Sequence, residues 1–133
     1  MTQYTIGVDI SKAHLDAHRL PDGIARQFAN DRRGFEELIK WIGKRGVARI
    51  VYEPTGIYHR SLEDTLAAVG LPLAKVNPLQ ARRFAEARGT RAKTDKVDAA
   101  VLAHMGLALQ PGLCAVPSKM LRDLKELQIA RQA

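Results

Sequence analysis

The sequence predicts an α/β domain with a five-stranded mixed sheet, three antiparallel strands followed by parallel ones, flanked by helices. The first observation is a strand-like alternation near the N-terminus, where Ile6, Val8 and Ile10 fall on one face. The second is the turn Pro21-Asp22-Gly23, which separates two further strand-like segments. The third is the alternation of helix and strand patterns after this hairpin, which favours parallel strands joined by right-handed crossovers.

The first third of the chain supplies the antiparallel strands and one helix. Asn30 and Asp31 are good N-caps, and apolar residues spaced by three and four from Phe35 to Ile42 give the helix a buried stripe. The expected segments are strands at Tyr4 to Ile10, about His14 to Leu20 and about Ile24 to Ala29, then this helix, which ends at Gly43 and Gly46.

The following segments alternate between strand and helix. Pro54 stops one short apolar strand, and Pro72 near the start of the next suits an edge position. We expect a strand from Val47 to Glu53, a helix from about Ile57 to Val69, a strand from Leu71 to Val76, a helix from Asn77 towards Gly89 and a helix from near Thr94 to about Gln110. This order of elements is that of a ribonuclease H-like domain.

The chain divides into a domain and a C-terminal segment. We expect residues 1–112 to form the ribonuclease H-like domain and residues 113–133 to begin a helical linker or dimerisation segment. Met120, Leu124 and Leu127 recur at four and three, the spacing of a helix–helix seam, within an amphipathic stretch from Ser118 to Gln132. We expect this helix to pair either with another copy of the chain, giving a homo-oligomer, or with residues that follow Ala133, and the alternative is that it folds back onto its own domain. It has no terminating signal, so we expect the sequence to be cut off there, before a C-terminal domain.

Composition fits one globular domain that works in a reducing cytoplasm. The chain has 133 residues, of which 46% are hydrophobic and 26% charged, and these values argue against disorder. No apolar run is long enough for a membrane helix, and the N-terminus lacks the pattern of a secretion signal. The single cysteine, Cys114, excludes an internal disulfide and a multi-cysteine zinc site.

The chain carries a net charge of +7, which favours a polyanionic partner such as nucleic acid. The surplus is concentrated between Arg82 and Lys96, where only Glu86 and Asp95 offset the basic residues. The basic residues expected to bind nucleic acid are Lys12, Arg82, Arg83, Arg88, Arg91, Lys93 and Lys96.

Two carboxylates lie near the ends of predicted strands. Asp9 sits between Val8 and Ile10, and a carboxylate on a central strand is costly to bury unless it is paired or bound to a cation. Glu53 closes the next strand, and ligands of open α/β sheets bind beyond the carboxyl ends of parallel strands. A turn-capping Asp9 and a simply exposed Glu53 are the alternative interpretations.

Two further carboxylates, Asp95 and Asp98, are expected on one helix face. Thr94 looks like an N-cap, so Asp95 would lie in the first turn, where the helix dipole alone can explain an acidic residue. Stepping back from Leu102 by four and then by three gives Asp98 and Asp95, so both extend the apolar stripe. Carboxylates held this close repel each other, and a divalent cation between them removes the repulsion.

We therefore expect these four carboxylates to meet at the carboxyl end of the central strands. Mg²⁺ or Mn²⁺ suits such a set, because both prefer oxygen ligands. Two such ions roughly 3.5–4 Å apart can activate the attacking oxygen and stabilise the leaving one in phosphodiester cleavage. The histidines show no ligand spacing and are interpreted as ordinary polar residues: His14, His18, His59 and His104.

Three motifs carry a resemblance to a known family. The segments Ile6 to Lys12 (IGVDISK), Tyr52 to Gly56 (YEPTG) and Lys93 to Ala99 (KTDKVDA) resemble the Asp-Glu-Asp-Asp transposases of bacterial insertion sequences, which are related to the pilin-gene invertases. The N-terminal domain of that family is similar to the Holliday-junction resolvases. The match spans the chain, and the three motifs occur in the family's order.

This resemblance implies a metal-dependent DNA transposase or site-specific recombinase, with Asp9, Glu53, Asp95 and Asp98 as catalytic metal ligands. It also implies a C-terminal domain that carries a serine nucleophile, and none of Ser11, Ser61 and Ser118 matches that downstream motif. Some relatives use a structured RNA as guide, so RNA is a partner that the resemblance admits beside DNA.

Two other functions stay open at the level of sequence. One is half of an actin-like ATPase, which starts with a similar hairpin, but Ser11 to His14 lacks the glycine that a phosphate-cradling turn needs. The other is a non-catalytic nucleic-acid-binding domain with a decayed site. Clustered carboxylates favour the nuclease, and scattered ones favour the decayed domain.

The basic stretch should contact phosphates rather than bases. Neutralising Arg88, Arg91 and Lys93 together should weaken DNA binding to a similar extent for all sequences and flatten its salt dependence. Binding titrations at several salt concentrations on unrelated duplexes measure both effects. A loss restricted to one DNA sequence would contradict the prediction.

Overall fold

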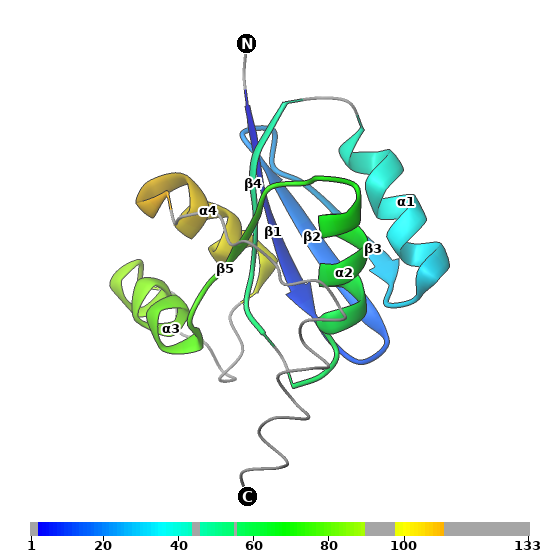
Figure 1. Ribbon diagram of the computed structural model, residues 1–133. Helices are drawn as coiled ribbons and strands as arrows, with labels where there is room; N and C mark the ends of the chain where they lie inside the picture. The colour runs from blue at the N-terminus through cyan, green and yellow to red at the C-terminus, as the bar shows by residue number, and fades with distance from the viewer. Residues whose placement is uncertain (1–2, 44–45, 55, 90–97, 111–133) are drawn as a thin grey trace, which may run out of the picture.

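The computed structural model describes residues 3–43, 46–54, 56–89 and 98–110 (Figure 1). The elements are β1 (Tyr4–Ile10), β2 (His14–Leu20), β3 (Ile24–Ala29), α1 (Arg32–Ile42), β4 (Val47–Tyr52), α2 (Arg60–Ala68), β5 (Leu73–Lys75), α3 (Pro78–Ala87) and α4 (Ala99–Leu109). Among these elements, no helix is both long and apolar enough to cross a membrane.

One mixed sheet of five strands, in the order β3-β2-β1-β4-β5, organises the fold. β1 pairs antiparallel with β2 and parallel with β4, and β5 extends the sheet in parallel beside β4. β3 pairs antiparallel with β2. The predicted fold class is confirmed, because the mixed sheet and its helices are consistent with a ribonuclease H-like fold.

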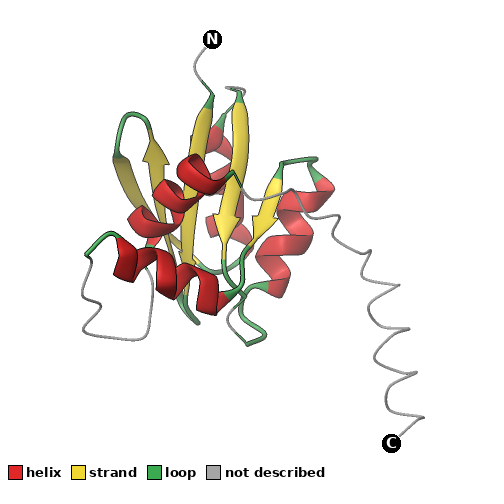
Figure 2. Cartoon of the chain, turned by 90° about the vertical axis from the view of Figure 1, so that its left-hand side faces the viewer, coloured by secondary structure: helices red, strands yellow, loops and turns green. Residues whose placement is uncertain are grey.

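Helices cover both faces of the sheet (Figures 1 and 2). α1 and α2 lie on one face, where Val8, Leu38 and Leu66 belong to the larger buried apolar cluster. α3 and α4 lie on the other face, over a smaller cluster that includes Val51 and Leu102. The central strand β1 is therefore buried on both sides, as its apolar sequence predicts.

The N-caps follow the side-chain chemistry of the sequence. Asp31 caps α1, and its Oδ1 accepts a hydrogen bond of 2.8 Å from the backbone nitrogen of Gly34. Asn77 caps α3 in the same way, with Pro78 in the first turn. Both starts match the predicted positions.

Several boundaries differ from the predicted ones. β4 ends at Tyr52 rather than Glu53, β5 is limited to Leu73–Lys75, and α2 begins at Arg60 rather than near Ile57. The helix predicted to begin near Thr94 begins instead at Ala99, and the earlier start is wrong because Asp98, the N-cap, has an extended backbone. Residues 111–133, with the predicted helix from Ser118 to Gln132, lie outside the described residues.

A buried polar network, which the sequence did not reveal, joins α2 to both parallel strands. The side chain of Glu63 is 2% exposed. Its Oε2 accepts a hydrogen bond of 2.6 Å from the Tyr52 hydroxyl and lies 3.0 Å from Nζ of Lys75. A buried carboxylate with these partners fixes the carboxyl ends of β4 and β5 to α2.

The approach of α4 to the sheet depends on glycine. A β-carbon at Gly7 would overlap the carbonyl oxygen of Ala99 and the backbone nitrogen of Ala103. Gly106 packs on strand side chains instead, since a β-carbon there would lie 2.5 Å from Cγ2 of Val51 and 2.8 Å from Cγ2 of Thr5. The backbone of α4 therefore lies directly on β1 at Gly7, and at Gly106 the helix lies close on side chains of β1 and β4.

Gly7→Ala should lower the free energy of unfolding by at least about 2 kcal/mol, because backbone atoms of α4 cannot yield as flexible side chains do. For a domain of this size the melting temperature should fall by roughly 5 °C or more. Gly46→Ala is the control, since a β-carbon there meets only Cγ of Gln3 at 3.8 Å. Thermal unfolding that is equally affected in both variants would contradict this account.

Candidate active site

Asp9 projects to the α4 face of the sheet near the carboxyl end of β1. Alternation along the strand sends Val8 and Ile10 into the core below α1 and α2, and Gly7 to the opposite face, against α4. Asp9 shares the face of Gly7, two residues further along, and is half-buried.

An open pocket of about 370 Å³ contains two of the predicted carboxylates. Asp9 and Asp98 both line it, although 88 positions separate the first strand from the start of α4 in the sequence. The other lining residues come from β2, β3 and the first turn of α4: Asp16, Ala17, His18, Ala25, Arg26, Gln27, Ala99 and Ala100. The structure thus brings Asp9 and Asp98 together.

Asp98 is the N-cap of α4 rather than a residue within the helix. Its φ and ψ are −77° and 170°, and its Oδ1 accepts a hydrogen bond of 2.9 Å from the backbone nitrogen of Val101. The spacing argument that placed Asp98 and Asp95 on one helix face therefore fails at Asp98. Asp95 itself lies outside the described residues.

Asp16 is a third carboxylate in this pocket, and the sequence reasoning missed it. It is the cross-strand partner of Asp9 in the antiparallel pair of β1 and β2. Directly opposed β-carbons in such a pair lie roughly 4.5–5.5 Å apart. Oδ1 of Asp16 accepts a hydrogen bond of 3.0 Å from Nε2 of Gln27, which orients the carboxylate. Counting outward from the turn at Ser11 to Ala13 would have paired these positions.

Glu53 lies at the same end of the neighbouring strand. Val8 pairs with Tyr52 in the parallel register, so Glu53 follows β4 at the level where Asp9 follows Val8. Its side chain is half-buried. Glu53 is not among the described residues that line the pocket of Asp9 and Asp98, and its role as a metal ligand stays a prediction.

Two histidines border the carboxylates. His18 lines the pocket, and its ring lies 6.3 Å from that of His104 on α4, centroid to centroid. Burial lowers the pKa of His104, and the charges of Arg88 and His18 lower it further, against the opposite effect of Asp98.

The predicted nucleic-acid-binding residues divide between described and undescribed parts of the chain. Lys12 is exposed just after β1, and Arg82 and Arg83 are exposed on α3. Arg88, the C-cap of α3, holds its guanidinium 5.7 Å from the centre of the Phe84 ring. The other predicted residues, Arg91, Lys93 and Lys96, fall outside the described ranges.

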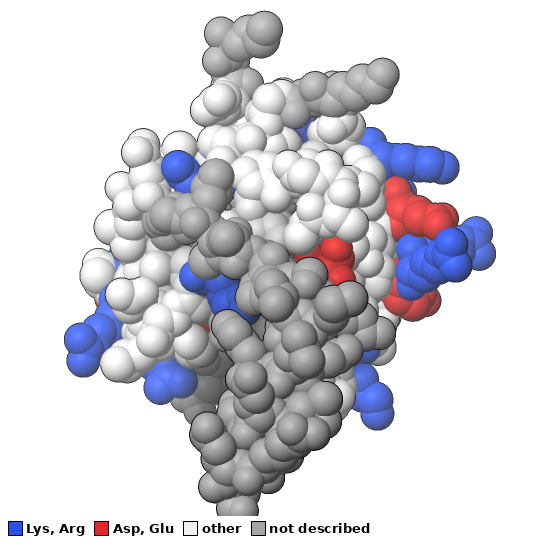
Figure 3. Space-filling view, in the orientation of Figure 1, with Lys and Arg blue, Asp and Glu red and all other residues white. Residues whose placement is uncertain are grey.

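The charged surface differs between the two helical layers. Figure 3 shows acidic and basic side chains interleaved over α1, where Arg32 pairs with Glu36 at 3.8 Å and Arg33 with Glu37 at 3.6 Å. Lys and Arg side chains stand out at the lower left of the same view, over α3. The α3 side is therefore the more suitable of the two for a polyanion.

The carboxylates that line the pocket are of the chemical type that binds a hard divalent cation. Asp9, Asp16 and Asp98 line one cavity, and Mg²⁺ and Mn²⁺ prefer carboxylate oxygens as ligands. Within the described ranges, no group of three or more Asp, Glu, His or Cys side chains already has the arrangement of a metal centre.

Comparison with known proteins gives a consistent result. The family model for DEDD transposases of the IS110 type, described as Transposase, matches residues 6–133. The pilin gene-inverting protein of Moraxella bovis is 33% identical over 119 residues, which cover 85% of this chain and 37% of that protein. The pilin gene-inverting protein of Moraxella lacunata matches with the same values. The chain thus spans about 37% of the length of these relatives.

His104 should make the stability of the domain dependent on pH. Because its pKa is lower in the folded state than the ordinary value of 6.5, the unfolded chain binds more protons as the pH falls through that value. The free energy of unfolding should therefore fall between pH 7.5 and pH about 5.5. Urea unfolding at both ends of this range should show a smaller fall for His104→Asn. An equal or larger fall in the variant would contradict the prediction.

Proposed function

Since the chain belongs to the IS110-type DEDD transposase family, we propose that it is the catalytic domain of a DNA recombinase that cleaves and transfers strands with divalent metal ions. The observation that carries the proposal is the pocket shared by Asp9 and Asp98, which come from distant parts of the sequence. Scattered carboxylates would have favoured a domain that only binds nucleic acid.

The residues proposed to hold the metal are Asp9, Glu53, Asp95 and Asp98, with Asp16 beside them. Such ions, when bound, supply activation of the attacking oxygen and stabilisation of the leaving oxygen of a phosphodiester. Asp98 is oriented by its bond to the backbone nitrogen of Val101, which uses one carboxylate oxygen. Asp16 is oriented through Gln27 and adds negative charge next to Asp9. These two hydrogen bonds hold the carboxylates of Asp98 and Asp16 in place before a metal ion binds.

The DNA is proposed to lie across the carboxyl end of the sheet. The cations proposed to contact its phosphates are exposed and lie just after β1 and on or at the end of α3: Lys12, Arg82, Arg83 and Arg88. Arg91, Lys93 and Lys96 are proposed to extend this contact. An RNA partner and self-association through the segment from Ser118 to Gln132 stay predictions of the sequence.

Asp9→Asn and Asp98→Asn should each abolish the proposed chemistry. Residues that merely support metal ligands typically contribute about 10–100-fold to affinity or activity, so loss of a ligand should exceed that range. Mn²⁺ binding to the 133-residue chain by titration calorimetry, and Mg²⁺-dependent DNA cleavage by the protein expressed from its full reading frame, measure the two effects.

Glu86→Gln is the matched control, because it removes one exposed carboxylate on α3. It should leave metal binding and cleavage unchanged. Asp98→Asn also changes the N-cap of α4, so its melting temperature must be measured beside its metal affinity. Wild-type Mn²⁺ affinity in a folded Asp9→Asn variant would reject the metal site and favour a domain that only binds nucleic acid.

A further inference from the structure

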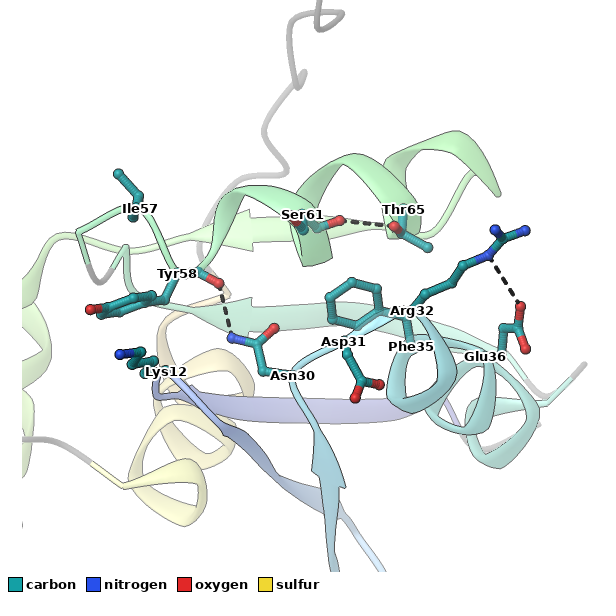
Figure 4. Close-up of a pocket in the computed structure, with 10 residues that line it drawn as sticks. All are labelled: Lys12, Asn30, Asp31, Arg32, Phe35, Glu36, Ile57, Tyr58, Ser61 and Thr65. Atoms are coloured by element: carbon teal, nitrogen blue, oxygen red, sulfur yellow. Dashed lines mark hydrogen bonds and ion pairs between the residues drawn. The ribbon is translucent and has the colours of Figure 1, made fainter.

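A second, larger pocket lies on the opposite face of the sheet from Asp9. It has a volume of about 570 Å³ and opens between the N-terminal parts of α1 and α2 (Figure 4). Its lining residues are Lys12, Asn30, Asp31, Arg32, Phe35, Glu36, Ile57, Tyr58, Ser61 and Thr65. The segments that follow β1, β3 and β4 all contribute, so the pocket lies at the same end of the sheet as the candidate active site.

Asn30 fixes the relative positions of these segments. Its side-chain nitrogen donates hydrogen bonds to the carbonyl oxygens of Ser11, at 2.8 Å, and Tyr58, at 3.1 Å. Its backbone nitrogen donates to the carbonyl oxygen of Ala13 at 2.9 Å. One residue thus ties the turn that carries Lys12 and the loop that carries Tyr58 to the start of α1. A pocket held in this way loses little entropy when a ligand binds.

One end of the pocket combines an available cation with exposed apolar groups. Lys12 is exposed and makes no ion pair with any residue that the structure describes. Tyr58 is 41% exposed and its neighbour Ile57 is 68% exposed. Figure 4 shows Lys12 and Tyr58 close together at one end of the pocket. An accessible aromatic ring beside a basic side chain is the combination that proteins use for an unpaired base and its phosphate.

The opposite end of the pocket carries its two acidic side chains, which repel any phosphate beyond the first. Asp31 is occupied as the N-cap of α1, and Glu36 lies 3.8 Å from Arg32. The two basic and two acidic side chains of the lining therefore sum to zero formal charge, and several consecutive phosphates would gain no net electrostatic attraction. A single phosphate at Lys12 avoids the two carboxylates. Ser61 and Asn30 leave polar atoms between the two ends that can bond to the edge of a base.

We propose that this pocket binds one unpaired nucleotide of the DNA strand that flanks the cleavage site, with its phosphate at Lys12 and its base against Tyr58. The inference rests on the proposed function, because it takes the ligand to be the strand processed at Asp9. Lys12 follows Asp9 by three residues at the end of β1, so a strand crossing that end of the sheet reaches both sites. A base that remains paired cannot enter, so the nucleotide must be unstacked.

The test is binding of a fluorescent single-stranded oligodeoxynucleotide to the 133-residue chain, measured by anisotropy without divalent metal. Lys12→Ala and Tyr58→Leu should each weaken binding about tenfold, the size of one stacking or phosphate contact. Lys40→Ala removes an equivalent charge from the other end of α1 and should have little effect. Tyr58→Phe keeps the ring and should bind as the unmodified chain does.

The outcomes separate this inference from the proposed function. Wild-type affinity in folded Lys12→Ala and Tyr58→Leu variants overturns the nucleotide pocket, whatever the cleavage assay gives. A loss seen with single-stranded RNA but not with DNA overturns it as well. If sedimentation shows a dimer that Tyr58→Leu dissociates, the pocket is a protein interface and the inference is wrong. Intact cleavage by Asp9→Asn rejects the metal site alone, because the anisotropy assay contains no metal.

Discussion

The contact of α4 with β1 is the constraint on which the candidate site depends. Gly7 lets the backbone of α4 contact β1 directly, and Gly106 leaves room on the helix for the side chains of Thr5 and Val51. This packing carries the N-terminus of α4, and with it Asp98, to the carboxyl end of β1, where Asp9 lies. Carboxylates repel one another, so attraction between them cannot have assembled the pocket. Apolar packing holds them together, and the cation proposed to bind there would relieve the resulting repulsion.

Local patterns predicted the first half of the fold closely, because they determine it. The alternation in β1 and the turn before β3 gave three strands whose observed ends match the predicted ones. The role of Asp31 as an N-cap could also be predicted from the sequence, since its side chain accepts a hydrogen bond within the first turn of its own helix. Alternation also placed Asp9 on the face away from the apolar residues of β1. These features involve neighbours in the sequence, and little tertiary information is needed.

The features that the sequence did not give depend on contacts between distant segments. Thr94 and Asp98 are both competent caps, and the packing of Ala99 against Gly7 favours the later start of α4. Asp16 lies in the pocket because the register of β1 and β2 places it opposite Asp9, and the alternation of apolar and polar residues does not specify that register. The pocket around Asn30 is formed by three loops, and its hydrogen bonds to Ser11 and Tyr58 span up to 28 positions. No periodicity in one segment encodes such bonds.

The two faces of the sheet use carboxylates in different ways. Glu63, on α2, has a side chain that is 2% exposed, and its carboxylate is bound by Tyr52 and Lys75 within the fold. A buried ion pair of this kind contributes geometry more than net stability, because desolvation offsets the attraction. Its effect here is to fix Tyr52, the residue immediately before Glu53. On the α4 face, Asp98 is exposed, and its Oδ1 accepts a hydrogen bond from the backbone nitrogen of Val101. The structural carboxylate is therefore buried among its partners, whereas Asp98, which is proposed to bind metal, is exposed and lines the pocket.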